Sequence, residues 1–236
     1  ITFEAAPPEG SPTGKAITCI VIMQNLPSML AVLLLATPTV ATLGVDVSYP
    51  PSSWSCLKSN GVSFAVVRVG RSTGHVDPNG RAMAQGALNA GIKYVDGYLF
   101  PCYKCGNPAG QVRQVVFNLK SSSGINSTVN ATEGMAYREQ GYNGTSAGMI
   151  IGMLWLDIEG TQYWSSSTSS NLNFIAGMVN EAESLGVKLG FYTSKFQWNP
   201  IAGGSTKYGK YPLWYAHYDN NPSFSDFSPF GGWSKP

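Results

Sequence analysis

Short apolar segments alternate with amphipathic segments along most of the chain. The apolar segments are rich in β-branched and aromatic residues and have the length of strands: residues 44–48, 64–69, 94–100, 154–159, 189–193 and 213–218. Segments with helical patterns lie between them, the first over residues 52–60. Repeated strand–helix units predict an α/β fold with a parallel sheet, here a TIM-like (β/α) barrel whose functional residues gather at the carboxyl ends of the strands.

Capping residues mark the predicted helix boundaries. Asp77-Pro78 and Asn107-Pro108 each place a capping side chain before a proline, so we expect a helix to begin at each pair. Gly91 and Gly186 are expected to end helices. Two stripes have the spacing of one helix face: Val112, Val115, Val116 and Leu119, and Leu172, Ile175, Ala176 and Val179.

The segment from Leu154 to Gly160 carries the main candidate chemistry. Its apolar run predicts a strand buried on both faces. Side chains alternate along a strand, so Trp155, Asp157 and Glu159 are expected on one face. Two acids there are costly unless they are paired, hydrogen-bonded or used. A carboxylate pair is what the cleavage of a glycosidic bond requires, whereas a satisfied ion pair or a strand-end cap is the alternative.

The N-terminal part has the features of an export signal. The apolar run 29–36 has the length of a signal peptide and is too short to cross a bilayer. Small residues at Thr39 and Ala41 fit a signal-peptidase site. Because the chain begins at Ile1, we interpret the segment before Met23 as an upstream or fragment sequence. The predicted organisation is a non-native segment 1–22, a signal peptide 23–41 and one domain 42–236.

Residues 121–149 interrupt the strand–helix pattern. They are rich in Ser, Asn, Gly and Thr and contain three glycosylation sequons, at Asn126, Asn130 and Asn143. We interpret them as an exposed, glycosylated insertion; a misplaced splice boundary is the alternative.

Composition narrows the class of function. The chain has 236 residues, of which 43% are hydrophobic and 12% charged, enough for one sizeable core. The net charge of +2 gives no electrostatic footprint for nucleic acid. The two histidines, His75 and His217, are too scattered to support a metal site or a Ser-His-Asp triad. We expect no cofactor, no membrane anchor and a monomer, and the low charge with abundant Gly, Ser, Asn and aromatic residues suits a secreted protein that handles glycans.

The cysteines leave two possibilities open. Cys102 and Cys105 either close a short disulfide or form half of a metal site that lacks its second half. Cys19 would be lost with the leader, which leaves Cys56 as an odd cysteine.

Taken together and in this order, several motifs resemble glycoside hydrolase family 25, the Chalaropsis-type lysozymes. They are Gly44-Val-Asp46-Val-Ser48, Leu156-Asp157-Ile-Glu159-Gly160, Gly190-Phe-Tyr192-Thr-Ser194 and Pro212-Leu-Trp214-Tyr-Ala-His217-Tyr218. The invertebrate branch looks especially similar, through Phe100-Pro-Cys102-Tyr-Lys-Cys105-Gly-Asn-Pro108 and the run 218–227. The resemblance covers roughly residues 44–120 and 150–236. It implies a barrel of irregular outline and hydrolysis of the β-1,4 bond between N-acetylmuramic acid and N-acetylglucosamine.

The resemblance also implies roles for the acids. Glu159 would donate a proton to the leaving oxygen, its acid form favoured by Asp157 and by the apolar wall of Trp155. Asp157 would stay ionised and stabilise the oxocarbenium-like transition state or position the acetamido group of the sugar. Asp46 would shape the charge balance, and Arg68 would either pair with these acids or form an ordinary interior salt bridge.

Three aromatic residues complete the expected site. Tyr98, Tyr192 and Trp214 are candidates to stack on sugar rings, with an ordinary core position as the alternative for each. The implied protein is a secreted, antimicrobial lysozyme of innate immunity with bacterial peptidoglycan as its partner.

Two departures from the family pattern qualify this interpretation. Many members have a His where this chain has Leu99, which would change a wall contact. The family also continues past the position of Pro236 through a strand with a further active-site Asp and through a Cys, so the barrel is expected to lack its last strand or strands. The alternatives are a chitinase-like hydrolase, a catalytically inactive glycan-binding or regulatory paralogue, and an unfolded pseudogene product.

Overall fold

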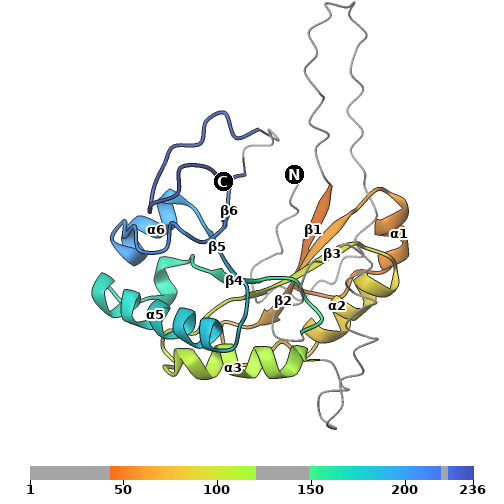
Figure 1. The fold of residues 1–236 in the computed structure, drawn as a ribbon, viewed down its shortest axis with the longest axis horizontal. Helices are drawn as coiled ribbons and strands as arrows, with labels where there is room; N and C mark the ends of the chain where they lie inside the picture. Colours follow the sequence, from red (N-terminus) through yellow and green to blue (C-terminus); the bar gives the residue numbers. More distant parts are fainter. Residues whose placement is uncertain (1–42, 121–148, 219–222) are drawn as a thin grey trace, which may run out of the picture.

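The computed structural model describes residues 43–120, 149–218 and 223–236, which form an α/β fold around one parallel sheet. Its six strands lie in chain order: β1 (Gly44–Val47), β2 (Phe64–Gly70), β3 (Tyr94–Leu99), β4 (Leu154–Asp157), β5 (Leu189–Thr193) and β6 (Leu213–Tyr215). The sheet curls into a half-barrel (Figure 1). This arrangement confirms the predicted α/β class and parallel sheet.

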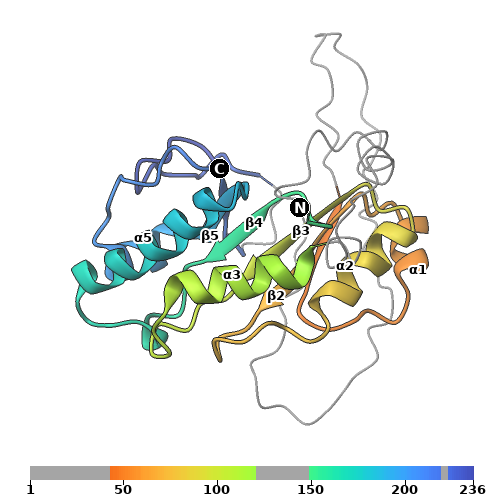
Figure 2. The ribbon, with the colours of Figure 1, turned by 60° about the horizontal axis from the view of Figure 1, so that its bottom comes forward.

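Helices cover the outer face of this sheet. The helices of the described part are α1 (Trp54–Ser59), α2 (Gly80–Asn89), α3 (Pro108–Leu119), α5 (Thr168–Ser184) and α6 (Lys195–Ala202), with a short 3-10 helix, η3 (Thr161–Tyr163). Of these, α2, α3 and α5 pack against the strands. Figure 2 shows α2, α3 and α5 in one layer across the strands, and α3 packs directly against α5. The inner face of the curl is therefore free of helices from this layer.

The core lies between the sheet and the outer helices. Side chains alternate along the strands, and one set, which includes Val67, Val95 and Leu156, faces the outer helices and is fully buried. The predicted stripe of α3 meets them, because Val112, Val115, Val116 and Leu119 are all buried. On α5 the buried stripe is centred on Phe174, Ile175, Met178 and Val179, whereas Leu172 and Ala176 are only partly buried.

One predicted helix start is confirmed and the other is wrong. The Asn107 side chain accepts a hydrogen bond from Gly110 N at 3.1 Å, and α3 begins at Pro108. Asp77 does not cap α2, which begins at Gly80 after Asn79. The buried Asp77 carboxylate pairs with Arg68 through Oδ2, 2.7 Å from Nε, and accepts from Asn79 N through Oδ1 at 2.9 Å. The carboxylate therefore bonds both Arg68 and the turn before α2, and the helix begins two residues later than the local pattern predicts.

Two further differences concern the C-terminal half. The predicted strand 213–218 ends at Tyr215, after which the chain leaves the sheet. The sequence pattern also missed α6, whose start is capped by the Ser194 hydroxyl, which accepts from Gln197 N at 3.3 Å.

Glycines on the inner face let the strands bend around aromatic rings. A Cβ atom on Gly44 would lie 2.0 Å from Phe64 Cζ, and one on Gly190 would lie 2.3 Å from Trp155 Cζ3. These rings occupy the space that a side chain on the neighbouring strand would need.

Several expectations fall on residues outside the described part of the chain. The proposed signal peptide, almost all of the insertion 121–149 and the sequons at Asn126, Asn130 and Asn143 all lie there. Within the described part, none of the helices has both the length and the apolar character to span a membrane.

Candidate active site

Every strand of the half-barrel contributes one predicted site residue to the inner face. The parallel register sets Arg68 beside Tyr98, and Asp157 beside Tyr192, which in turn lies beside Trp214. Residues paired in this way share a face of the sheet. The same alternation places the Asp46 side chain of β1 on this face, because its register partner Val66 lies two residues before Arg68. The six predicted residues from Asp46 to Trp214 thus face the inside of the curl.

The curl brings the acid of the first strand to the acids of the fourth. In a flat sheet, β1 and β4 would lie about 14 Å apart, three strand spacings. In the structure, burial raises the pKa of Asp46 to about 7, with a further contribution from the negative charge of Glu159, while Arg68 acts in the opposite direction. Asp46 and Glu159 are therefore parts of one electrostatic cluster.

Asp157 is the most enclosed member of this cluster. It is only 4% exposed, and its Oδ1 has no hydrogen-bond partner among the described residues. Burial, followed by the charges of Glu159 and Asp46, raises its pKa well above the usual range. This change is opposite in direction to the expectation that Asp157 stays ionised, and that expectation stays a prediction.

Glu159 lies two residues beyond the end of β4 and is less enclosed than Asp157. Burial raises its pKa as well. A carboxyl group whose pKa is raised above its usual range is better suited to general acid catalysis. The expected direction of the Glu159 pKa is confirmed, with burial rather than the neighbouring carboxylate as the leading cause.

Arg68 forms an interior salt bridge and also acts on the acid cluster. Its guanidinium pairs with Asp77, their side chains being 11% and 2% exposed, and it donates from Nη2 to Ser48 O at 3.3 Å. Its positive charge still lowers the pKa of Asp46. The interior salt bridge weighed from the sequence is therefore present, and pairing of Arg68 with the predicted site acids stays a prediction.

Aromatic side chains line the face beside the acids. The Tyr192 ring lies against Trp214, with centroids 4.7 Å apart, and Trp214 contacts Trp155 at 5.8 Å. The hydroxyl oxygens of Tyr192 and Tyr218 are 2.6 Å apart. Burial, together with the charges of nearby acids, raises the pKa of both Tyr98 and Tyr192. The three predicted aromatic residues therefore border the acid cluster.

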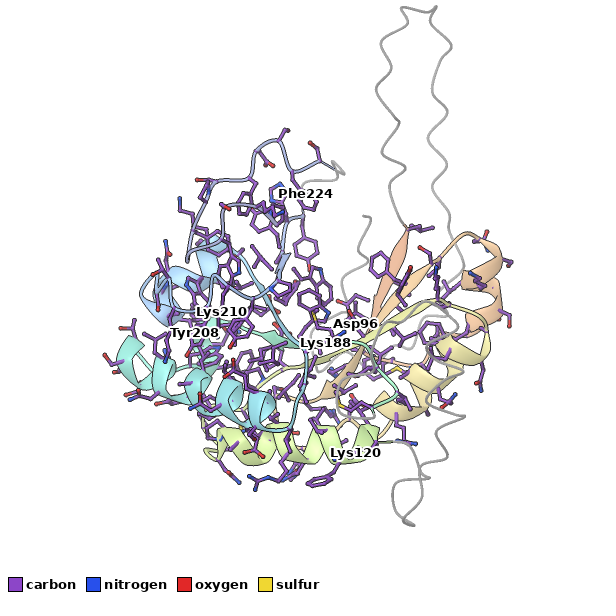
Figure 3. All side chains as sticks on the ribbon, in the orientation of Figure 1. Asp96, Lys120, Lys188, Tyr208, Lys210 and Phe224 are labelled. Atoms are coloured by element: carbon purple, nitrogen blue, oxygen red, sulfur yellow. A yellow bond between two sulfur atoms is a disulfide. The ribbon has the colours of Figure 1, made fainter. Side chains whose placement is uncertain are left out.

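Sequence reasoning missed Asp96, a further inner-face acid. Its Oδ2 accepts from Trp155 Nε1 at 3.0 Å and its Oδ1 from Met153 N at 2.9 Å. Figure 3 places it in the middle of the curved sheet, well away from Phe224 of the C-terminal segment. The period of two along β3 could have identified Asp96, because it lies two residues before Tyr98.

The position of Leu99 corrects another expectation. Leu99 is 1% exposed, and a Cβ atom on Gly70 would meet both Leu99 and Val115 of α3. It therefore belongs to the outer core, so the absence of a His at this position does not alter a wall of the site.

The CxxC motif forms a disulfide between Cys102 and Cys105. The loop around it is held by Gln111, whose Nε2 donates to Cys102 O at 2.9 Å and to Gly106 O at 2.8 Å. Among the described residues, no group of three or more His, Cys, Asp or Glu side chains is placed to hold a metal ion.

Solved structures with the same fold are lysozymes. A muramidase from Acremonium alcalophilum superimposes with a TM-score of 0.60 and 20% sequence identity, covering 81% of this chain and 82% of that one. A family GH25 lysozyme from Aspergillus fumigatus gives a TM-score of 0.59 and 21% identity, with 81% and 83% covered. The curled α/β half-barrel is thus the fold of a class of glycoside hydrolases.

Sequence relatives specify the family. The family described as "Lysozyme-like protein 1" matches residues 37–132 and 125–236. "Probable GH family 25 lysozyme 2" of Dictyostelium discoideum is 48% identical over 198 residues, which is 83% of this chain and 81% of the relative. "Lysozyme-like protein 5" of Caenorhabditis elegans is 35% identical over 198 residues, 82% and 80% of the two chains. The chain belongs to the lysozymes of glycoside hydrolase family 25.

Proposed function

We propose that this chain is a secreted muramidase that hydrolyses the β-1,4 bond between N-acetylmuramic acid and N-acetylglucosamine in bacterial peptidoglycan. The observation that carries the proposal is the cluster of Asp46, Asp157 and Glu159 at the carboxyl ends of two strands of a curled parallel sheet. The cleavage of a glycosidic bond needs one carboxyl group with a raised pKa as the acid and a second, ionised carboxylate close to it. We interpret the curled sheet as part of a TIM-like barrel, in which this end carries the active site.

In this mechanism Glu159 donates its proton to the glycosidic oxygen as the bond to the leaving sugar breaks. Asp157 faces the sugar ring from the inner face of β4 and either stabilises the positive charge that develops there or orients the acetamido group of the sugar. The charge of Asp46 raises the pKa of Asp157, and the positive charge of Arg68 lowers the pKa of Asp46. The enclosed site strengthens each of these electrostatic effects.

The aromatic border supports a glycan as the substrate. Tyr98, Tyr192 and Trp214 present ring surface beside the acids, and Trp214 and Tyr98 keep part of that surface accessible. Sugar rings have apolar faces that suit such surfaces, while the few polar groups nearby set their orientation.

We place the activity outside the cell, as an antibacterial one. The support is the pattern of residues 23–41, which fits a signal peptide, and the sequons at Asn126, Asn130 and Asn143, which fit a glycosylated exported chain.

The test is the Glu159→Gln variant, which keeps the shape of the side chain and removes its acid. Loss of general acid catalysis alone lowers the rate by about 10²–10⁴-fold, so lysis of purified peptidoglycan should fall at least that far while the fold remains intact. Glu183→Gln, a change of the same kind on the exposed end of α5, serves as the control and should keep full activity. Near-wild-type lysis by Glu159→Gln would refute the assignment, and a preference for chitin oligomers over muropeptides would favour a chitinase instead.

A further inference from the structure

The Glu159 carboxyl group makes no hydrogen bond within the described part of the chain, although it is the proposed proton donor. It also lies beyond Asp157, the last residue of β4, so the strand ladder does not hold it directly. Its position over the inner face must therefore come from the backbone that carries it.

Side chains from β5 and α6 bond that backbone on either side of Glu159. The Thr193 hydroxyl donates to Ile158 O at 2.8 Å, and Thr193 is completely buried. On the other side, Gly160 N donates to Gln197 Oε1 at 3.0 Å.

A third side chain bonds the backbone of Glu159 itself. The indole Nε1 of Trp164 donates to Glu159 O at 2.9 Å. This indole is buried, and its ring contacts Tyr103 and Phe174, both with centroids 6.0 Å away. Its donor atom is therefore fixed by core packing.

The turn that follows closes the same region. Gly160 adopts a left-handed conformation with φ of 67°, and its carbonyl accepts from Tyr163 N at 2.8 Å. A Cβ atom at Gly160 would lie 2.6 Å from Tyr163 Cδ2, so only glycine allows the ring to pack there.

From these contacts we propose that Thr193, Trp164 and Gln197 are positioning residues that hold Glu159 in place for proton transfer. The inference rests on the proposed function, because it assigns these three residues a role in the reaction of that same site. None of them needs to touch the substrate. Each of them forms a hydrogen bond with a backbone group of residues 158–160. Together these bonds restrict the movement of the Glu159 carboxyl group, which must stay in one position to transfer its proton.

The expected size of the effect follows from the geometry of catalysis. A displacement of about 1 Å from the reactive arrangement can lower a rate by about 10²-fold. Loss of one of three hydrogen bonds should therefore lower kcat by about 10–100-fold. The KM should change little, because sugar contacts with the aromatic border stay in place.

Thr193 allows the sharpest experiment, in which kcat and KM are measured for the full chain on a soluble peptidoglycan oligomer. Thr193→Val keeps the shape of the side chain and removes the hydroxyl, whereas Thr193→Ser keeps the hydroxyl. We expect kcat to fall about 10–100-fold in Thr193→Val, with KM within about twofold of wild type. Thr193→Ser should recover most of kcat.

Gln197→Met and Trp164→Phe repeat the test on the other two bonds. Gln197 lies half-buried at the start of α6, so Gln197→Met provides the measurement if a buried substitution fails to fold. Trp233→Phe is the matched control for Trp164→Phe. Trp233 is also buried and donates from Nε1 to a backbone carbonyl, Tyr211 O at 2.8 Å, but it lies in the C-terminal segment.

The outcomes separate the two proposals. If the wild type lyses peptidoglycan and Thr193→Val keeps its kcat, positioning by this hydrogen bond is refuted. Two other results would also overturn the inference: an equal loss of kcat in Trp233→Phe and Trp164→Phe, or an equal loss in Thr193→Ser and Thr193→Val. Either result would mean that the loss of kcat comes from general destabilisation of the fold. Absence of activity in the wild type would instead overturn the proposed function, and the positioning role with it.

Discussion

The most informative perturbation is Asp46→Asn, because burial raises the pKa of the Asp46 carboxyl to about 7 and an asparagine cannot ionise. Its pKa is about 7 in the folded protein against 3.8 for an exposed aspartate, and burial is the main cause. Between these two pH values the folded protein binds the proton more strongly than the unfolded chain does. The wild type is therefore destabilised as the pH rises through this window, and the asparagine variant is not.

The difference between 3.8 and about 7 corresponds to about 4 kcal/mol. Asp46 keeps some solvent access, which reduces this value, so we expect Asp46→Asn to be more stable than wild type by between about 1 and 4 kcal/mol at pH 8. Near pH 4 this difference in stability between the variant and wild type disappears. Loss of the Asp46 charge also lowers the pKa of Asp157, which adds to the gain at high pH.

Urea unfolding followed by tryptophan fluorescence at pH 4, 6 and 8 measures this dependence. The stability difference between Asp46→Asn and wild type should grow with pH, while lysis should fall because the cluster is altered. Glu183→Gln is a control of opposite sign, since hydrogen bonds from Tyr211 and Lys210 lower the pKa of Glu183. A difference for Asp46→Asn that stays constant with pH, or that favours the wild type at pH 8, would refute the reasoning.

Two further substitutions test the framework of the site. Arg68→Met leaves the buried Asp77 carboxylate without its ion pair and should cost about 3–5 kcal/mol of stability in urea unfolding. The double variant Arg68→Met/Asp77→Asn should recover part of this stability. If it recovers none, the lost ion pair is not the cause. Gly190→Ala introduces a Cβ atom 2.3 Å from Trp155 Cζ3 and should cost about 1–3 kcal/mol with a change in tryptophan fluorescence. An unchanged midpoint would mean that the ring can move aside freely.

The local patterns predicted most of the secondary structure correctly. Strands such as β2 and β5 have apolar periodicity strong enough to locate them, and Asn107-Pro108 marked the start of α3. The failures came where a distant partner outweighed the local signal. Asp77 resembled a helix cap, but its carboxylate bonds both the guanidinium of Arg68 and Asn79 N, and the helix begins only at Gly80. No local pattern reports that competition.

The candidate acids followed from the sequence, but their relationship did not. Alternation along the predicted strand 154–159 put Asp157 and Glu159 on one face, and the similarity to lysozyme motifs singled out Asp46. Only the curl of the sheet brings Asp46 of the first strand to the acids of the fourth and changes the pKa of each. The pKa of each acid depends on that enclosure, which no local pattern in the sequence describes.

The sequence by itself determined the strand–helix order, the face on which each site residue lies and the family to which the motifs point. Each of these depends on residues close together in the chain, whose spacing sets periodicity and local geometry. The tertiary structure decided which acids raise one another's pKa, which partner holds Arg68 and which side chains hold the backbone at Glu159. Those features depend on distances between residues far apart in the chain, and packing sets these distances only once the sheet has curled.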